Sequence, residues 1–212
     1  MFLFPTLYLQ DILGFSPLQA GLAFLPLAAA VGVTAVLGSR LAGRAGYKWP
    51  MVAGPLITAA GLVLLAGMGV GGTYLGDVLP GFLVIGAGFG MTLVAATIAA
   101  TGAAPPEQEG LASALLTAAQ QLGFALGYAM LAGVASSATA AYLASHRHGL
   151  GALAQVYGYR SAFLVAAAVA VACSLFALVF VRWRRGEKTL RSGRPRSAGV
   201  TRRPVMDTLE VR

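Results

Sequence analysis

Long apolar runs separated by short polar segments dominate the chain. Uncharged stretches near residues 18–39, 50–70, 79–103, 111–135 and 161–181 are each long enough for the roughly 20 residues that a helix needs to cross a bilayer. Lipid offers no partner to exposed backbone groups, and these stretches lack the alternation of a barrel strand, so we expect helices. The pattern predicts an all-α, polytopic transmembrane helix bundle with five spans over residues 10–181.

The opening segment, residues 1–9, is apolar but too short to cross a membrane. A helix of this length rises only about 14 Å. We interpret it as the remnant of a preceding transmembrane helix. Either a truncated chain or a naturally shortened one would leave such a remnant, and we favour truncation.

The composition places the chain in lipid. Of its 212 residues, 58% are hydrophobic and only 10% are charged, with a mean hydropathy of +0.77, whereas soluble domains are roughly 25% charged. A net charge of +8 would be compatible with binding to nucleic acid, but ten of the 15 Lys and Arg residues lie in residues 182–212. We predict that this segment is a disordered tail attracted to anionic lipid headgroups. We therefore expect the lipid bilayer as a partner and no nucleic acid.

The distribution of cations predicts the orientation. Arg40, Arg44 and Lys48 crowd the link after the first full span, while the links around Asp11 and Asp77 carry no Lys or Arg. Cytoplasmic loops carry the excess of Lys and Arg, so this link and the basic tail are expected inside the cell. Alternation places the 136–160 loop outside, where we expect a short helix along the membrane surface. We therefore predict a multi-pass protein that lies in the cell (plasma) membrane with its C-terminus in the cytoplasm.

The five apolar stretches contain no Asp, Glu, Lys, Arg or His. Ionisable groups inside the membrane usually carry proton relays, so these helices alone have no visible means of coupling to protons. The sequence also lacks a G-x-x-x-x-G-K-[ST] phosphate loop and a serine with a plausible base. The His146-Arg147-His148 cluster is a poor metal site without further ligands. We expect no enzyme, no catalytic residue, no cofactor and no metal.

One helix, 111–133, carries a stripe of polar and aromatic residues at three- and four-residue spacing. The stripe consists of Ser113, Thr117, Gln120, Gln121, Phe124 and Tyr128. Two adjacent amides in hydrocarbon would cost several kcal/mol without partners, so they must bond to protein, water or substrate. Lining of a substrate cavity and hydrogen bonding between helices both remain open.

Small residues suggest where helices approach one another. Ala119, Gly123 and Gly127 are expected on roughly the opposite face of the same helix, where spacing by four favours helix packing. In the 79–103 stretch, Gly86, Gly90, Thr97 and Thr101 also recur at helical spacing. We assign the two glycines to packing and the two threonines to the cavity.

Three segments carry a resemblance to a known family. They are LQDILGFSPLQAG at residues 9–21 with Phe24-Leu25-Pro26-Leu27 after it, the glycines of Gly86-x-Gly88-x-Gly90, and the run from Pro106-Glu107 to Gln120-Gln121-Leu122-Gly123. Together they cover nearly the whole hydrophobic part. They resemble the fourteen-span drug/proton antiporter branch of the major facilitator superfamily, in which arginine is common at the position of Gln120.

The link at residues 39–48 resembles the degenerate second copy of that family's signature loop, and Arg40, Arg44, Gly46 and Lys48 belong to it by this resemblance. Ser39 stands where glycine is usual and Gly43 where aspartate is usual. The family uses this loop as a charge-based latch between helix ends. The missing carboxylate argues against a strong latch here.

The resemblance implies that the chain is the C-terminal repeat of a major facilitator fold, without most of its first helix. The missing N-terminal transporter half would then carry the proton-coupling carboxylates. The implied function is proton-coupled efflux of a small lipophilic substrate by alternating access. Helices 79–103 and 111–133 would face the cavity, and 50–70 and 161–181 would be peripheral. A non-transporting membrane scaffold or partner-binding subunit is the alternative.

Overall fold

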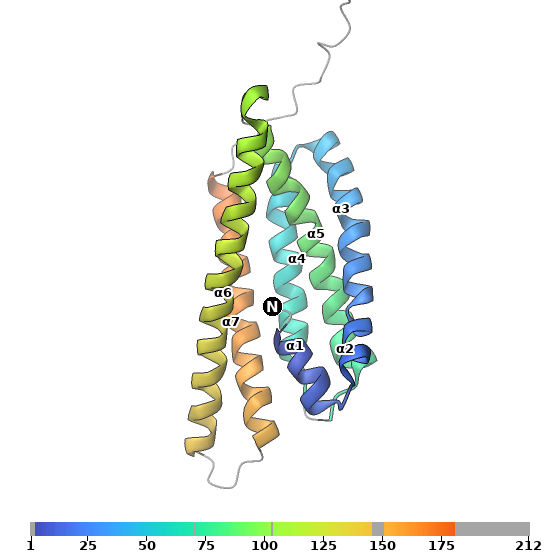
Figure 1. Ribbon diagram of the computed structural model, residues 1–212, viewed down its shortest axis with the longest axis vertical. Helices are drawn as coiled ribbons and strands as arrows, with labels where there is room; N and C mark the ends of the chain where they lie inside the picture. The colour runs from blue at the N-terminus through green and yellow to red at the C-terminus, as the bar shows by residue number, and fades with distance from the viewer. Residues whose placement is uncertain (1–2, 70, 103, 146–150, 181–212) are drawn as a thin grey trace, which may run out of the picture.

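The computed structural model describes residues 3–69, 71–102, 104–145 and 151–180, and within these ranges it contains helices and turns but no strand (Figure 1). The elements are α1 (Leu3–Leu7), η1 (Tyr8–Ile12), α2 (Pro17–Ala23), α3 (Leu25–Ala45), α4 (Lys48–Ala66), η2 (Tyr74–Val78), α5 (Leu79–Thr101), η3 (Pro106–Gln108), α6 (Glu109–Ser145) and α7 (Gly151–Phe180). In this part of the chain, five helical segments are long and apolar enough to cross a membrane. The all-α transmembrane bundle predicted from the sequence is confirmed.

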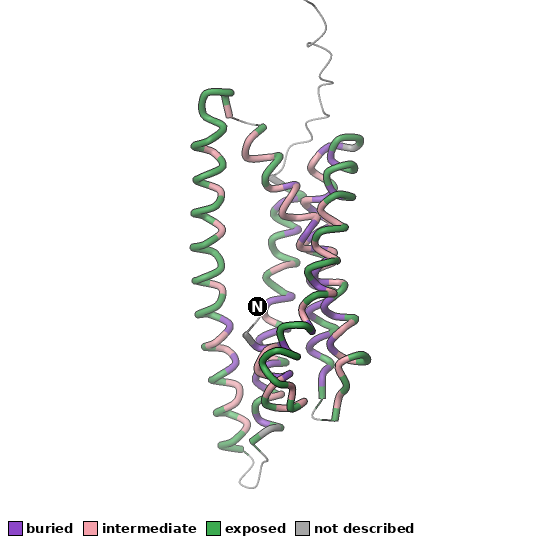
Figure 2. The backbone as a smooth tube through the Cα atoms, turned by 45° about the vertical axis from the view of Figure 1, so that its right-hand side comes forward, coloured by how far each residue is buried: buried purple, intermediate pink, exposed green. Residues whose placement is uncertain are grey.

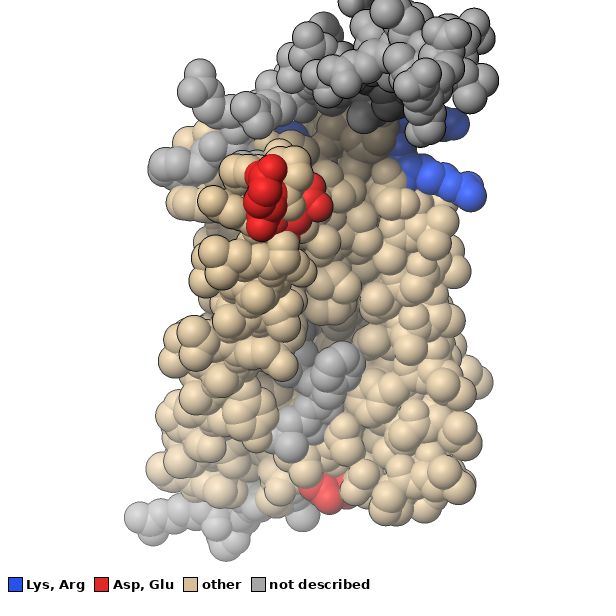
Figure 3. Space-filling view, turned by 45° about the horizontal axis from the view of Figure 1, so that its top comes forward, with Lys and Arg blue, Asp and Glu red and all other residues tan. Residues whose placement is uncertain are grey.

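The charged side chains mark two opposite ends of the bundle. Arg40, Arg44 and Lys48 lie at one end, which we call the Lys48 end, and Asp11 and Asp77 lie at the other, which we call the Asp77 end. Figure 3 shows the coloured charges at these ends and an uncharged surface between them. Charged side chains are costly inside the hydrocarbon layer, so a protein that spans a bilayer carries them mainly at its two ends.

The first span is broken near its Asp77 end. It begins at a capping box, in which the Ser16 hydroxyl accepts a hydrogen bond from the Gln19 N–H at 3.3 Å and the Ser16 N–H donates to Gln19 Oε1 at 2.9 Å. The break at Phe24 separates α2 from α3. It follows from Pro26, which has no N–H to continue the helical ladder.

Two contacts hold the broken segment, one against η2 and one against α5. The Tyr74 hydroxyl donates a hydrogen bond to the Ala23 carbonyl at 2.7 Å, directly beside the break. The Phe24 ring stacks on Phe82 with centroids 4.9 Å apart. The hydroxyl therefore supplies a donor where the helix is interrupted.

A tight turn joins α3 to α4. Gly46 has a φ of +86°, a backbone conformation that L side chains rarely adopt. Its N–H donates to the Ala42 carbonyl at 3.0 Å and ends α3. Lys48 already begins α4, while Arg40 and Arg44 remain exposed in the last turns of α3. The basic segment is therefore mostly helix end rather than a long loop.

Glycines let α5 approach both of its neighbours. A Cβ at Gly86 would lie 2.7 Å from the Leu27 carbonyl of α3, and one at Gly88 would collide with the Gly54 carbonyl of α4. Real Cβ atoms essentially never come so close to a backbone atom. Small residues at such crossings give membrane helices close van der Waals contact. In Figure 2 the buried segments gather along these central helices.

The remaining spans, α6 and α7, form a pair that joins the bundle through α4. A Cβ at Gly158 of α7 would lie 2.6 Å from the Ala135 carbonyl of α6. The buried Ser174 hydroxyl of α7 donates to the Val52 carbonyl of α4 at 2.8 Å. These contacts make α7 the bridge between α6 and the other spans.

The prediction of a long outer loop at residues 136–160 is wrong. Helix α6 continues to Ser145, and α7 already begins at Gly151. The hydroxyls that lower the hydropathy here bond to their own helix, as in the 2.8 Å hydrogen bond from Thr139 to the Ala135 carbonyl. Such residues weaken an apolar pattern without ending a helix. The His146–His148 cluster and the basic tail, 182–212, lie outside the described residues.

The segment interpreted as a helix remnant is helical and buried. In α1 the Phe4 ring lies 5.5 Å from Tyr159 and 6.2 Å from Phe163, both on α7. In the π-helical turn η1, the Tyr8 hydroxyl donates to the Gly69 carbonyl at 2.7 Å. Helix α1 begins about midway along the bundle and runs toward the Asp77 end (Figure 1).

Candidate functional site

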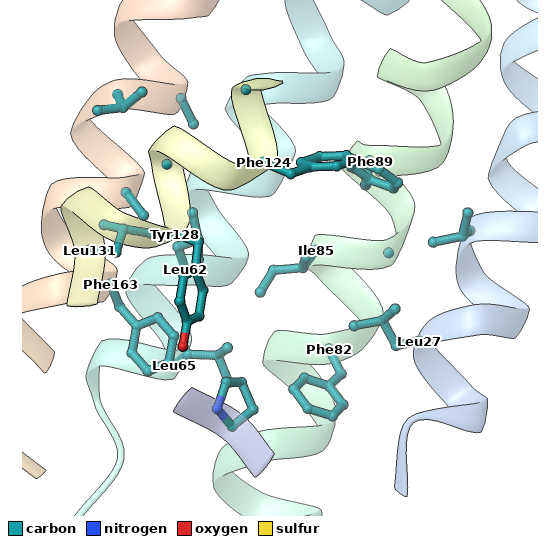
Figure 4. A pocket seen from close by; sticks show the side chains of 18 of the residues that line it. Leu27, Leu62, Leu65, Phe82, Ile85, Phe89, Phe124, Tyr128, Leu131 and Phe163 are labelled. Atoms are coloured by element: carbon teal, nitrogen blue, oxygen red, sulfur yellow. The ribbon is translucent and has the colours of Figure 1, made fainter. Parts of the chain in front are cut away.

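A pocket of about 1020 Å³ lies between α6 and the other spans. Figure 4 shows its walls on α3, α4, α5, α6 and α7. The residues that line it are Pro5, Leu27, Ala28, Val31, Leu62, Leu65, Phe82, Ile85, Gly86, Phe89, Gln121, Gly123, Phe124, Ala125, Gly127, Tyr128, Met130, Leu131, Phe163, Ala166, Val169 and Ala170. The volume is at the upper end of the roughly 300–1,000 Å³ typical of ligand pockets.

The pocket is almost wholly apolar. Among the described residues that line it, only Gln121 and Tyr128 carry oxygen or nitrogen in their side chains, and none is charged. Both polar side chains come from α6 and are exposed. A wide apolar wall with a few polar groups is the usual composition of a site for small organic molecules.

Helix α6 supplies the largest share of the lining. Three members of its predicted stripe, Gln121, Phe124 and Tyr128, face the pocket. Gly123 and Gly127, which were expected on roughly the opposite face, line the same pocket. Gly127 is three residues from Phe124, and residues at this spacing share a helix face.

The other predicted cavity residues lie nearer the Lys48 end, outside the pocket lining. They are Ser113, Thr117 and Gln120 on α6 and Thr97 and Thr101 on α5. The three threonine hydroxyls donate to carbonyls of their own helices at 2.9–3.0 Å. The structure therefore leaves these five residues in a separate polar stretch on the two helices that flank the pocket.

The residues predicted to pack helices lie against a neighbouring helix in α5 but are more open in α6. Gly86 and Gly90 of α5 lie against the backbone of α3. Ala119 is exposed, and a Cβ at Gly123 or Gly127 would meet no atom of the described chain within 4 Å. A packing role for these three residues of α6 stays a prediction.

The aromatic part of the pocket includes residues that sequence reasoning missed. Phe89 of α5 and Phe124 of α6 lie with ring centroids 6.4 Å apart and an interplanar angle of 41°. Figure 4 shows these two rings beside each other at one edge of the pocket. Phe82, Ile85 and Phe89 recur at three- and four-residue spacing, a signal that the glycines between them concealed.

The helices expected at the periphery, 50–70 and 161–181, also reach the pocket. Leu62 and Leu65 of α4 and Phe163 and Ala166 of α7 belong to its wall. The reason is that α6 diverges from α5 toward the Asp77 end, so α4 and α7 close the space between them (Figures 1 and 4). The pocket is therefore deeper than a groove between α5 and α6 alone.

A match to a known family model identifies the family of this chain. The model of the Major Facilitator Superfamily matches residues 1–210, nearly the whole chain. The chain belongs to the major facilitator superfamily. This membership makes it a multi-pass membrane protein of a transporter family rather than an enzyme.

Several curated proteins are similar in sequence to this chain. The puromycin resistance protein of Streptomyces alboniger is 38% identical over 204 residues, which are 95% of this chain and 40% of that protein. The multidrug resistance protein Stp of Mycobacterium tuberculosis (strain ATCC 25618 / H37Rv) is 34% identical over 146 residues, 69% of this chain and 27% of that protein. The tetracenomycin C resistance and export protein of Streptomyces glaucescens is 36% identical over 132 residues, 60% of this chain and 24% of that protein. The chain thus spans two fifths or less of these relatives.

Proposed function

We propose that this chain is the C-terminal repeat of a drug/proton antiporter of the fourteen-span branch, and that it exports small lipophilic compounds by alternating access together with an N-terminal half. The observation that carries the proposal is the apolar pocket of about 1020 Å³ beside α6. In transporters of this design, substrate sites lie near the membrane midplane between repeats.

The lining of the pocket supports a lipophilic substrate. Sugars and anions need dense polar or cationic contacts, whereas the described residues of this wall offer only the Gln121 amide and the Tyr128 hydroxyl. A largely apolar molecule with one or two hydrogen-bonding groups matches that chemistry. The names of the relatives, which refer to resistance to puromycin and export of tetracenomycin C, agree with such a substrate class.

The coupling ion enters through another part of the transporter in this proposal. Among the described residues that line the pocket there is no carboxylate, imidazole or amine that could bind and release a proton. A proton relay in a membrane needs such groups. The N-terminal half would therefore hold the carboxylates, and this chain would supply the apolar wall.

The orientation proposed here puts the Lys48 end in the cytoplasm of a cell whose plasma membrane holds the protein. Arg40, Arg44 and Lys48 support it, because cytoplasmic ends of membrane helices carry the excess of cations. The C-terminus would follow α7 on the same side. Export would then run from the Lys48 end toward the Asp77 end.

Efflux of a lipophilic fluorescent dye tests the proposal. The dye is loaded into cells that express this chain alone and, separately, the chain extended by its upstream coding sequence. We expect proton-driven efflux from the extended form only, and loss of that efflux when the pH gradient is collapsed. Efflux from neither form, with both proteins in the membrane, would contradict an antiporter and favour the non-transporting scaffold.

A further inference from the structure

One aromatic pair connects the two helices that flank the pocket. Phe89 lies on α5 and Phe124 on α6, with ring centroids 6.4 Å apart. This separation is within the 4.5–7 Å at which aromatic rings attract each other. Phe124 nevertheless keeps 55% of its surface exposed.

The pair stands at a change in chemistry along both helices. Helix α5 runs toward the Lys48 end and α6 runs back from it. The pocket-lining residues of α5 end at Phe89, and those of α6 begin within one turn of Phe124. Beyond the pair, toward the Lys48 end, lies the polar stretch of Thr97, Thr101, Ser113, Thr117 and Gln120. An apolar pocket and a hydroxyl-bearing stretch thus meet at two phenylalanine rings.

We propose that Phe89 and Phe124 form a constriction between the apolar pocket and a hydroxyl-lined vestibule that opens at the Lys48 end. This inference rests on the proposed function only for the direction of transport. A single ring pair is worth little energy, so it can part when an apolar ligand arrives. Water and ions gain nothing by entering the apolar space behind it. The pair would therefore select for ligands that can replace its ring contact.

Thiol accessibility tests the constriction without requiring transport. The native Cys173 of α7, which is exposed, is first changed to Ala. Gly127→Cys then reports on the pocket, where a Cβ meets no atom within 4 Å, and Thr117→Cys reports on the vestibule. Inside-out membrane vesicles carrying the whole gene product are treated with a membrane-impermeant maleimide, which reaches the Lys48 end in the proposed orientation.

We expect rapid labelling at Thr117→Cys and slow labelling at Gly127→Cys. Adding Phe124→Ala or Phe89→Ala should accelerate labelling at Gly127→Cys about two- to tenfold, the range that the strength of one aromatic pair implies. Phe124→Tyr, which keeps the ring, should restore slow labelling. Leu126→Ala removes a side chain of similar size that is 72% exposed and outside the pocket lining, and it should change nothing.

Two results would overturn the constriction. Equal labelling at Gly127→Cys with and without the rings would show that they close nothing, and unlabelled Thr117→Cys would show that no aqueous vestibule exists. Right-side-out vesicles identify the accessible end independently. Ring-dependent labelling in a protein that moves no dye would contradict the proposed transport while leaving the constriction intact.

Discussion

Helices α5 and α6 follow one another along the chain and both carry glycines at helical spacing, yet they meet their neighbours differently. Helix α5 lies between α3 and α4 and buries Gly81, Phe82, Ile85, Gly86, Gly88, Gly90 and Ala95. Helix α6, with 37 residues, buries only Leu131 and Ala135, where it contacts α7. Most of the other residues of α6 are exposed (Figure 2). The first helix is held by its neighbours, whereas the second leaves most of its surface open.

A glycine in a membrane helix therefore has two uses. At Gly88 the missing side chain brings another backbone into contact, and at Gly123 it widens an open space. Spacing by four cannot distinguish these cases, because it fixes only the face of the helix. What lies opposite that face is decided by helix tilt and by the neighbours.

The largest effect is expected from a side chain inserted between α5 and α4. Gly88→Leu should lower the free energy of unfolding by about 3 kcal/mol or more, since its Cβ would collide with the Gly54 carbonyl. Gly123→Leu on α6 is the matched control, with an expected change within about 0.5 kcal/mol. Denaturation of the protein in detergent, followed by circular dichroism, measures both. Equal destabilisation would contradict the contrast between the helices.

A smaller effect is expected where α6 does pack. Gly158→Val should cost about 1–3 kcal/mol, because a Cβ there lies 2.6 Å from the Ala135 carbonyl. Gly133→Val, at a position of α6 where a Cβ meets no atom within 4 Å, should cost much less. The same denaturation experiment compares them. If the Gly158→Val protein were as stable as the Gly133→Val protein, α6 would not be anchored on α7 as described.

A single hydroxyl at the helix break should matter less than either glycine. Tyr74→Phe removes the 2.7 Å hydrogen bond to the Ala23 carbonyl and should cost about 1 kcal/mol. Tyr128→Phe removes a hydroxyl of α6 that faces the pocket and should leave the free energy of unfolding nearly unchanged. Thermal unfolding of the two variants side by side measures the difference. If the Tyr128→Phe protein were unstable, the Tyr128 hydroxyl would have a structural role in stabilising the fold.

The smallest effect on stability, with a clear effect on transport, is expected at Gln121. Gln121→Leu removes one of the two polar side chains among the described residues of the pocket wall, and it should change drug resistance while membrane expression and stability stay constant. Gln155→Leu, an exposed position of α7 outside the pocket lining, controls for the loss of an amide.

Growth inhibition by a panel of lipophilic drugs, with quantified surface expression, measures the outcome. Lost insertion or stability would favour the interpretation that Gln121 joins helices. Unchanged resistance and unchanged stability would contradict both interpretations.

Much of the fold could be predicted because membrane helices are encoded locally. Runs of about 20 apolar residues determine the spans, and Pro26 and Gly46 mark a break and an end by their own backbone properties. The error at residues 136–160 has the opposite cause. Hydroxyl-rich helix ends resemble loops in a hydropathy profile, although their side chains bond to their own backbone.

The site could be predicted only in part. The polar stripe of α6 identified Gln121, Phe124 and Tyr128, which reach the pocket, and also Ser113 and Thr117, which do not. A stripe gives the face of a helix but not the depth at which neighbouring helices leave room. The apolar wall residues gave no signal, because they look the same in sequence whether they face lipid, protein or a cavity.

The lengths of the spans have a consequence for the membrane itself. Helix α4 has 19 residues and rises about 28 Å, close to the roughly 30 Å of the hydrocarbon layer, whereas the 37 residues of α6 rise about 55 Å. A tilt of 40° would still leave α6 longer than that layer. Bilayer thickness therefore acts on the protein through α4. In lipids with longer acyl chains, the charged start of α4 would be drawn inward or the bilayer would thin around it. Helix α6 would still be long enough to span the thicker layer.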